Sequence, residues 1–194
     1  EIGNLLLAAG SFNEGEHIFR TIITDAKDDS QIIQACADAL NNEKLAKASG
    51  RSNEIKILAS TFYIQVNNYG KAKKIFITLL KKSKEQILQI RLLTYITLIT
   101  LLDNSVEEAK SFLHEQNKFD TFLNEIESPL PQLTMEVIRS FDQRDFTLFS
   151  QIKARFNSII NEDMTLRRIF QEITKLKPQP SPMDGLASLF GNLG

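Results

Sequence analysis

The chain has 194 residues, of which 42% are hydrophobic and 24% charged, with a single cysteine and no tryptophan. This composition is typical of a globular protein with a buried core and excludes both a disordered chain and a disulfide framework. The formal net charge of −1 conceals two blocks. Residues 44–91 hold eleven basic and two acidic residues, whereas residues 103–145 hold ten acidic and four basic ones. Net charges of +9 and −6 point to binding partners more than to a small substrate.

The predicted elements are helices throughout, because apolar residues recur at steps of three and four along nearly the whole chain. Early helical faces are indicated by Ile18, Ile22 and Ile23, and by Ile32, Ile33, Cys36, Ala39 and Leu40. A third face carries Ile55, Leu58, Ala59, Phe62 and Val66. We expect about ten to twelve helices with short loops, and no strands, since no alternating run is bounded by hairpin turns.

Helix starts are predicted from local chemistry. Asp28-Asp29-Ser30 and Arg51-Ser52-Asn53 supply N-cap residues, and Ser83-Lys84-Glu85-Gln86 and Ser105-Val106-Glu107-Glu108 fit capping boxes. Pro129 and Pro131 end one helix and open the next. The most apolar run, 87–102, is shorter than the roughly 20 residues of a bilayer crossing and contains Gln89 and Arg91. No signal peptide is recognised at the start, and we expect a cytoplasmic protein without membrane insertion.

A weak internal repeat places a small residue between two bulky ones. It occurs around Gly15, recurs around Ala72 and returns more loosely around Ala109. The small residue lets a neighbouring helix approach closely. The spacing from Ala72 to Ala109 is near the 34 residues of a tetratricopeptide unit, whereas Gly15 to Ala72 fits no whole number of units. We therefore predict an all-α fold, an irregular α-solenoid of tetratricopeptide-like hairpins over residues 1–177, divided into hairpins at about 1–82 and 83–177.

No catalytic or metal-binding constellation is evident, so we predict a protein that is not an enzyme and has no cofactor. At helical spacing His17 has only Glu14 and His114 has no acid, and no phosphate-binding or nucleophile motif occurs. Cys36 lies on an apolar helix face and is interpreted as a packing residue.

The basic block has two interpretations of similar weight. Its lysines either form a solvated face that favours a helix C-terminus, or dock an acidic protein surface. Nucleic acid is not expected, because aromatic residues occupy core-like positions instead of lying between the charges.

The C-terminus, 178–194, combines a Pro-rich linker with a short amphipathic helix. Its apolar stripe consists of Leu186, Leu189, Phe190 and Leu193. The helix either folds back on the solenoid or is presented to a groove in a partner.

Several segments resemble one protein family. Residues 10–21 are similar to the first repeat of the Golgi to ER traffic protein 4 family, a scaffold of tail-anchored protein targeting, and residues 67–72 are similar to its middle repeat. Residues 145–149, 155–156 and 167–170 are similar to the last helices of that family, and the C-terminal tail also looks like that of the family. The resemblance runs in order through most of the chain, although the chain is shorter than is usual for the family.

The resemblance implies a non-enzymatic α-solenoid with two kinds of partner. The N-terminal hairpins would dock on the targeting ATPase, and the C-terminal part would bind a ubiquitin-like protein that links to a co-chaperone. By position, the residues expected to meet the ATPase are Phe12, Glu16, His17 and Arg20, with Lys44, Lys47 and Arg51 extending the face.

An alternative function is a generic tetratricopeptide co-chaperone adaptor that clamps the C-terminal carboxylate of a peptide. Such a clamp needs Lys and Asn side chains that converge on one groove. Asn67, Lys71 and Lys74 are partial candidates.

Overall fold

The computed structural model describes residues 3–4, 7, 9–26, 29–48, 50–103, 106–115 and 128–176. These ranges contain eleven helices and no strand, so the all-α prediction is confirmed for the described part of the chain. The predicted Pro-rich linker and C-terminal helix over 178–194 lie outside the described residues.

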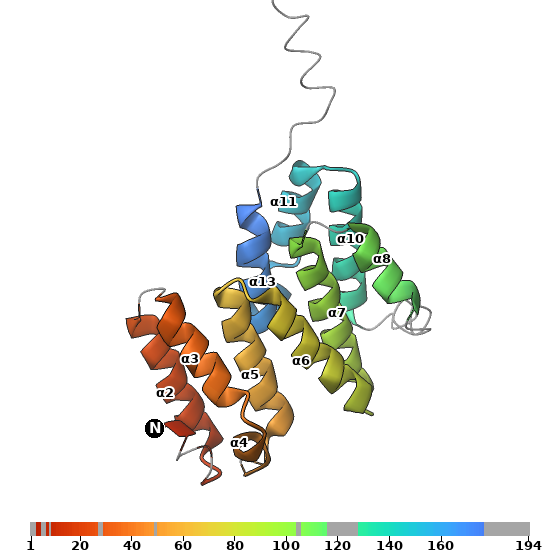
Figure 1. Cartoon of the computed structure of the whole chain (residues 1–194). Helices are drawn as coiled ribbons and strands as arrows, with labels where there is room; N and C mark the ends of the chain where they lie inside the picture. Colours follow the sequence, from red (N-terminus) through yellow and green to blue (C-terminus); the bar gives the residue numbers. More distant parts are fainter. Residues whose placement is uncertain are drawn as a thin grey trace, which may run out of the picture.

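Consecutive helices lie side by side along most of the molecule (Figure 1). In chain order they are α2 (Phe12–Asp25), α3 (Ser30–Leu40), α4 (Glu43–Ala48), α5 (Ser52–Gln65), α6 (Tyr69–Lys82), α7 (Gln86–Leu102), α8 (Val106–Glu115), α10 (Pro129–Asp142), α11 (Phe146–Arg155), α12 (Asn157–Glu162) and α13 (Met164–Lys175).

Short polar side chains cap several helix starts, because a side-chain oxygen there satisfies an N–H that has no partner within the helix. Asp29 caps α3 by accepting from Gln31 N at 2.9 Å, and Asp145 caps α11 by accepting from Leu148 N at 2.8 Å. Pro129 opens α10, as predicted. The capping box predicted at Ser83 is wrong. Helix α7 begins at Gln86, and the Ser83 hydroxyl instead accepts from Glu85 N at 3.2 Å in the connecting segment.

The small residues of the weak repeat all lie at close helix contacts. Ala72 and Ala109 are fully buried, and Gly15 is buried against the segment before α2. A Cβ atom at Gly15 would lie 2.6 Å from Leu7 Cγ, which is closer than real carbon atoms approach. Close approach is therefore shown at Gly15, and the burial of Ala72 and Ala109 is consistent with the same interpretation.

Helix α7 lies at the centre of the core. It packs against α6, α8, α10 and α13, and every residue from Leu92 to Leu102 is buried. A helix that is apolar around its whole circumference must be covered on all sides, which explains the apolar run 87–102 without a membrane. Two of its three buried threonines have hydrogen-bond partners, whereas the buried hydroxyl of Thr97 has none among the described residues. Thr100 donates to Ile96 O at 2.8 Å, and Thr94 accepts from Thr134 of α10 at 3.2 Å.

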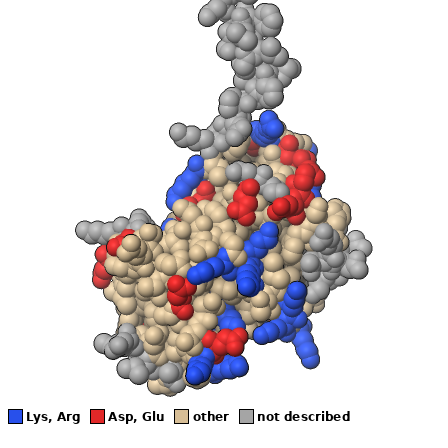
Figure 2. Space-filling view, viewed as in Figure 1, with Lys and Arg blue, Asp and Glu red and all other residues tan. Residues whose placement is uncertain are grey.

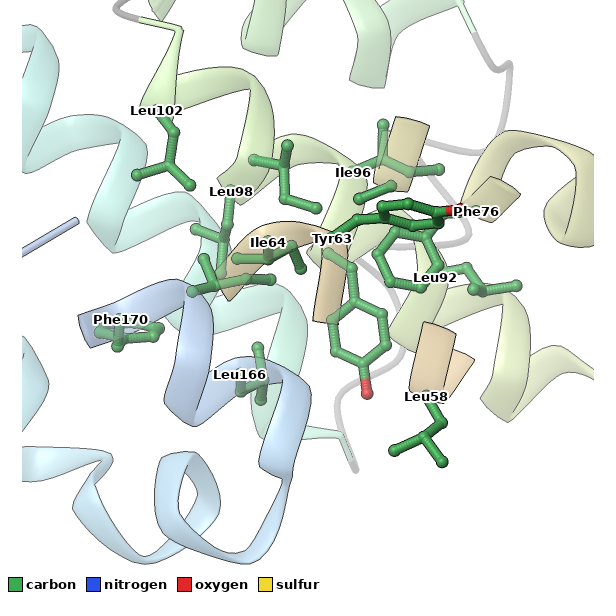
Figure 3. Close-up of a cluster of buried hydrophobic side chains, with 14 of the residues drawn as sticks. Leu58, Tyr63, Ile64, Phe76, Leu92, Ile96, Leu98, Leu102, Leu166 and Phe170 are labelled. Atoms are coloured by element: carbon green, nitrogen blue, oxygen red, sulfur yellow. The ribbon is translucent and has the colours of Figure 1, made fainter. Parts of the chain in front are cut away.

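Helix α13 returns to the middle of the chain and packs on both α5 and α7. Figure 3 shows its Leu166 and Phe170 in one cluster with Ile64 of α5 and Leu98 of α7. The hydroxyls of Thr61 and Thr165 form a buried hydrogen bond of 2.8 Å between α5 and α13. Packing is therefore not restricted to neighbouring hairpins, because the end of the described chain also contacts its middle.

A polar cluster fixes the start of α13 against α7. Asp163 caps α13 by accepting from Leu166 N at 3.0 Å, and its other oxygen accepts from Arg91 Nη2 at 2.9 Å and from the Tyr95 hydroxyl. Burial raises the pKa of Tyr95, and the Asp163 carboxylate raises it further, so the phenol remains a donor at neutral pH. One carboxylate thus serves a helix start and two donors from the central helix.

A substitution in α13 tests whether its packing against α5 and α7 stabilises the fold. We expect Leu166→Ala to lower the free energy of unfolding by about 2 to 5 kcal/mol, because Leu166 is fully buried and its loss leaves a cavity. The measurement is urea unfolding followed by circular dichroism. The control is Ile87→Ala in α7, whose side chain is 69% exposed and should change stability by no more than about 0.5 kcal/mol. Similar small losses in both variants would contradict the contact.

Candidate protein-interaction surfaces

A lysine-rich surface lies along α6 and just after it. The core side of α6 consists of Ala72, Phe76, Leu79 and Leu80, at the spacing of one helical face. The basic residues consequently face outward, and Lys74, Lys81, Lys82 and Lys84 are all exposed. We call these four residues the α6 lysine surface.

Lys71 of α6 is not part of this surface, because its ammonium group already has partners. Lys71 Nζ lies 3.1 Å from Asp38 Oδ1 and 5.1 Å from the centre of the Tyr63 ring. Among the described residues, by contrast, no acidic group lies within ion-pair distance of the α6 lysine surface. Lys81 and Lys82 also occupy the last turn of α6, where positive charge favours the helix dipole.

Acidic side chains gather elsewhere on the same face. Figure 2 shows basic groups over α6 and acidic groups over α8. Lys110, a base within the acidic block, is paired, since its ammonium lies 2.7 Å from Asp142 and 3.2 Å from Glu107. The hydrogen bond to Asp142 raises the pKa of Lys110. On the face shown, the basic groups of α6 thus lie apart from the acidic groups of α8.

The residues predicted to meet an ATPase fall into three places. Arg51 stacks on Phe12, with the guanidinium carbon 5.0 Å from the ring centre, and Phe12 itself is buried. Glu16 and Arg20 form an ion pair along α2. His17 of α2 is exposed, and so are Lys44 and Lys47 of α4. Because Phe12 belongs to the core, it would support Arg51 in any complex instead of contacting a partner. The binding of these residues to an ATPase stays a prediction.

A cleft of about 340 Å³ opens where α2, α5 and α13 meet. Its charged lining residues are all arginines, namely Arg20, Arg167 and Arg168. Only Arg20 was singled out as a site residue from the sequence. The adjacent pair Arg167-Arg168 was a visible signal, but nothing in the sequence indicates that α13 lies beside α2.

Two of the three candidate residues for a peptide clamp already have partners within the chain. Asn67 Oδ1 accepts from the Tyr69 hydroxyl at 2.8 Å, and Lys71 holds Asp38. Lys74 is left exposed. The three side chains therefore do not all point their polar atoms at one empty groove.

The remaining candidates from the sequence are the cysteine, possible metal ligands and the C-terminal apolar residues. Cys36 is buried, as predicted, and burial raises the pKa of its thiol, which disfavours the reactive thiolate. Within the described ranges, no cluster of three or more His, Cys, Asp or Glu side chains is placed to hold a metal ion. Leu186, Leu189, Phe190 and Leu193 lie outside the described residues.

Comparisons with protein-family models, with curated proteins and with solved structures found no match. Among the described helices, none has both the length and the apolar character that a bilayer crossing requires.

The hydrogen bonds that Asp38 accepts beside the α6 lysine surface predict how the pKa of its carboxyl changes on substitution. The Tyr63 hydroxyl donates to Asp38 Oδ1 at 2.5 Å, and this bond lowers the pKa of the Asp38 carboxyl, with smaller contributions from Gln34 and Lys71. We expect Tyr63→Phe to raise the pKa of Asp38 toward its ordinary value, and Lys71→Gln to raise it less. Carboxyl-carbon NMR titration measures both shifts.

The same carboxyl links stability to pH. Because its pKa is lower in the folded than in the unfolded chain, Asp38 stabilises the fold above its unfolded pKa, and this stabilisation is lost as pH falls through the folded value. Asp38→Asn should therefore cost stability at neutral pH and cost progressively less in acid. A destabilisation that does not change between neutral and acidic pH would contradict the coupling.

Proposed function

We propose that this protein is a non-enzymatic helical scaffold that binds an acidic surface of a protein partner through the α6 lysine surface. The observation that carries the proposal is the arrangement of Lys74, Lys81, Lys82 and Lys84, which are exposed and have no acidic partner among the described residues. Elsewhere on the described surface several bases are paired, as Lys71 and Lys110 are.

Unpaired surface charge supports a docking role for a physical reason. A lysine that already pairs with a neighbouring carboxylate gains little from a second one, whereas an unpaired lysine adds its full attraction to an approaching acidic surface. Several such lysines on one helix raise the rate of encounter and orient the partner. The continuous apolar core behind α6 keeps the helix in place, since Ala72 and Phe76 are completely buried.

The family resemblance gives the proposal its finer form. In that form the scaffold is a tetratricopeptide-like α-solenoid of tail-anchored protein targeting, and the acidic partner is the targeting ATPase. The second partner, a ubiquitin-like protein or a co-chaperone adaptor, would bind the C-terminal part, and the protein would act in the cytoplasm. The support for this form is the run of similar segments, from residues 10–21 to 167–170.

Charge reversal on α6 tests the proposal. We expect Lys81→Glu/Lys82→Glu to weaken the complex with the targeting ATPase at least about tenfold, because two attractive charges become repulsive. Binding of the unaltered protein should also weaken between roughly 50 mM and roughly 500 mM NaCl, as exposed charges are screened. Isothermal titration calorimetry measures both effects.

The competing site is tested with Lys44→Glu/Lys47→Glu, which reverses the same number of exposed charges on α4, at the face that the family resemblance implies for the ATPase. If the α4 variant loses binding and the α6 variant does not, the ATPase contacts the N-terminal face and not α6. Absence of any complex at low salt would reject the ATPase as the partner.

A further inference from the structure

The cleft between α2, α5 and α13 combines concentrated positive charge with an apolar floor. Arg20 reaches it from α2, and Arg167 and Arg168 reach it from successive positions of α13. Ile23, Phe62 and Met164 supply apolar lining. The volume of about 340 Å³ lies at the lower end of the range for ligand sites.

The three guanidinium groups are only partly neutralised. Arg20 pairs with Glu16, which does not line the cleft, and also donates to Met164 Sδ. Arg168 Nε lies 3.5 Å from Glu172 and has no hydrogen-bond acceptor, although the atom is buried. Arg167 is exposed, and no side-chain bond from its guanidinium to a described residue is formed.

Arginine is suited to one class of ligand group. Its planar guanidinium offers parallel N–H donors that match the two oxygens of a carboxylate. No acidic residue lines this cleft, and of its three arginines Arg20 and Arg168 are already close to the carboxylates of Glu16 and Glu172, so Arg167 is the one left to meet an incoming carboxylate. The Thr24 hydroxyl donates to Arg20 O at 2.9 Å and keeps its oxygen lone pairs as acceptors for a ligand N–H.

We propose that this cleft binds an acidic peptide segment of a partner protein, with a Glu or Asp carboxylate on Arg167 and a neighbouring apolar side chain against Phe62 and Met164. An inorganic anion would satisfy the arginines but leave the apolar floor unused, and this is why a peptide is the better fit. The site lies on α2, α5 and α13, so it is separate from the α6 lysine surface and goes beyond the proposed function.

The experiment uses the full chain and a fluorescein-labelled peptide in which Glu and Leu alternate. We expect the peptide to bind, and the same peptide with Gln in place of Glu to bind at least about tenfold more weakly, because its charge-assisted hydrogen bonds are lost. Arg167→Glu should weaken binding by a similar factor, and Arg167→Gln by less. Fluorescence anisotropy measures all four affinities. The matched control Lys81→Glu, a reversal of one exposed charge on α6, should change binding by less than about twofold.

Methionine methyl groups locate the bound peptide. The chain contains three methionines, of which Met164 lines this cleft and Met135 lines a separate cavity of about 270 Å³ between α8 and α10. With ¹³C-methyl methionine, we expect the Glu-Leu peptide to shift the Met164 signal and leave the Met135 signal unchanged.

Four outcomes would overturn the proposal. They are no binding at a peptide concentration of about 1 mM, equal binding of the Glu and Gln peptides, equal losses with Arg167→Glu and Lys81→Glu, and displacement of the peptide by an equal concentration of inorganic phosphate. Each of these leaves the ATPase measurement on α6 unaffected, so the two proposals fail separately. A thermal unfolding midpoint equal to that of the unaltered protein confirms that Arg167→Glu remains folded.

Discussion

The burial of α7 is the constraint on which the rest of the structure depends. From Leu92 to Leu102 every residue of this helix is buried, so it needs neighbours around its whole circumference. Helices α6, α8, α10 and α13 supply them. The order of helices in the chain accounts for α6 and α8, which adjoin α7 directly, but α13 has to return from the far end. A central helix that is apolar on every side therefore requires the chain to close on itself.

The hydrogen bonds of Asp163 fix the position of α13 along α7. Apolar contacts alone would let α13 slide along α7, because they have little directionality. Asp163 caps α13 while it accepts from Arg91 and Tyr95, so the N-cap residue of the helix is tied to two side chains of α7. Since Arg167 and Arg168 follow within about a turn and a half, this fixed start also sets where the arginines face α2 and α5.

The sequence was informative where the signal is local. The helical class, the buried Cys36, the small residues Gly15, Ala72 and Ala109, and Pro129 at the start of α10 all follow from periodicity, size or backbone chemistry. The arginine cleft could not be predicted, because its walls come from segments far apart in the chain. Phe12, a bulky residue of the repeat around Gly15, is buried as that pattern indicates, whereas the family resemblance implied that it contacts a partner.

The two basic sites suit different kinds of contact because lysine and arginine differ in hydration and geometry. The ammonium groups of the α6 lysine surface are strongly hydrated point charges on an exposed helix, so they attract over distance and are screened by salt. The arginines line a concave site with apolar lining, where a planar donor group makes directed bonds at short range. A partner carrying acidic residues both on its surface and in an extended segment would engage the two sites in succession. The lysines would speed its approach, and the cleft would select among acidic segments by the apolar side chain beside the carboxylate.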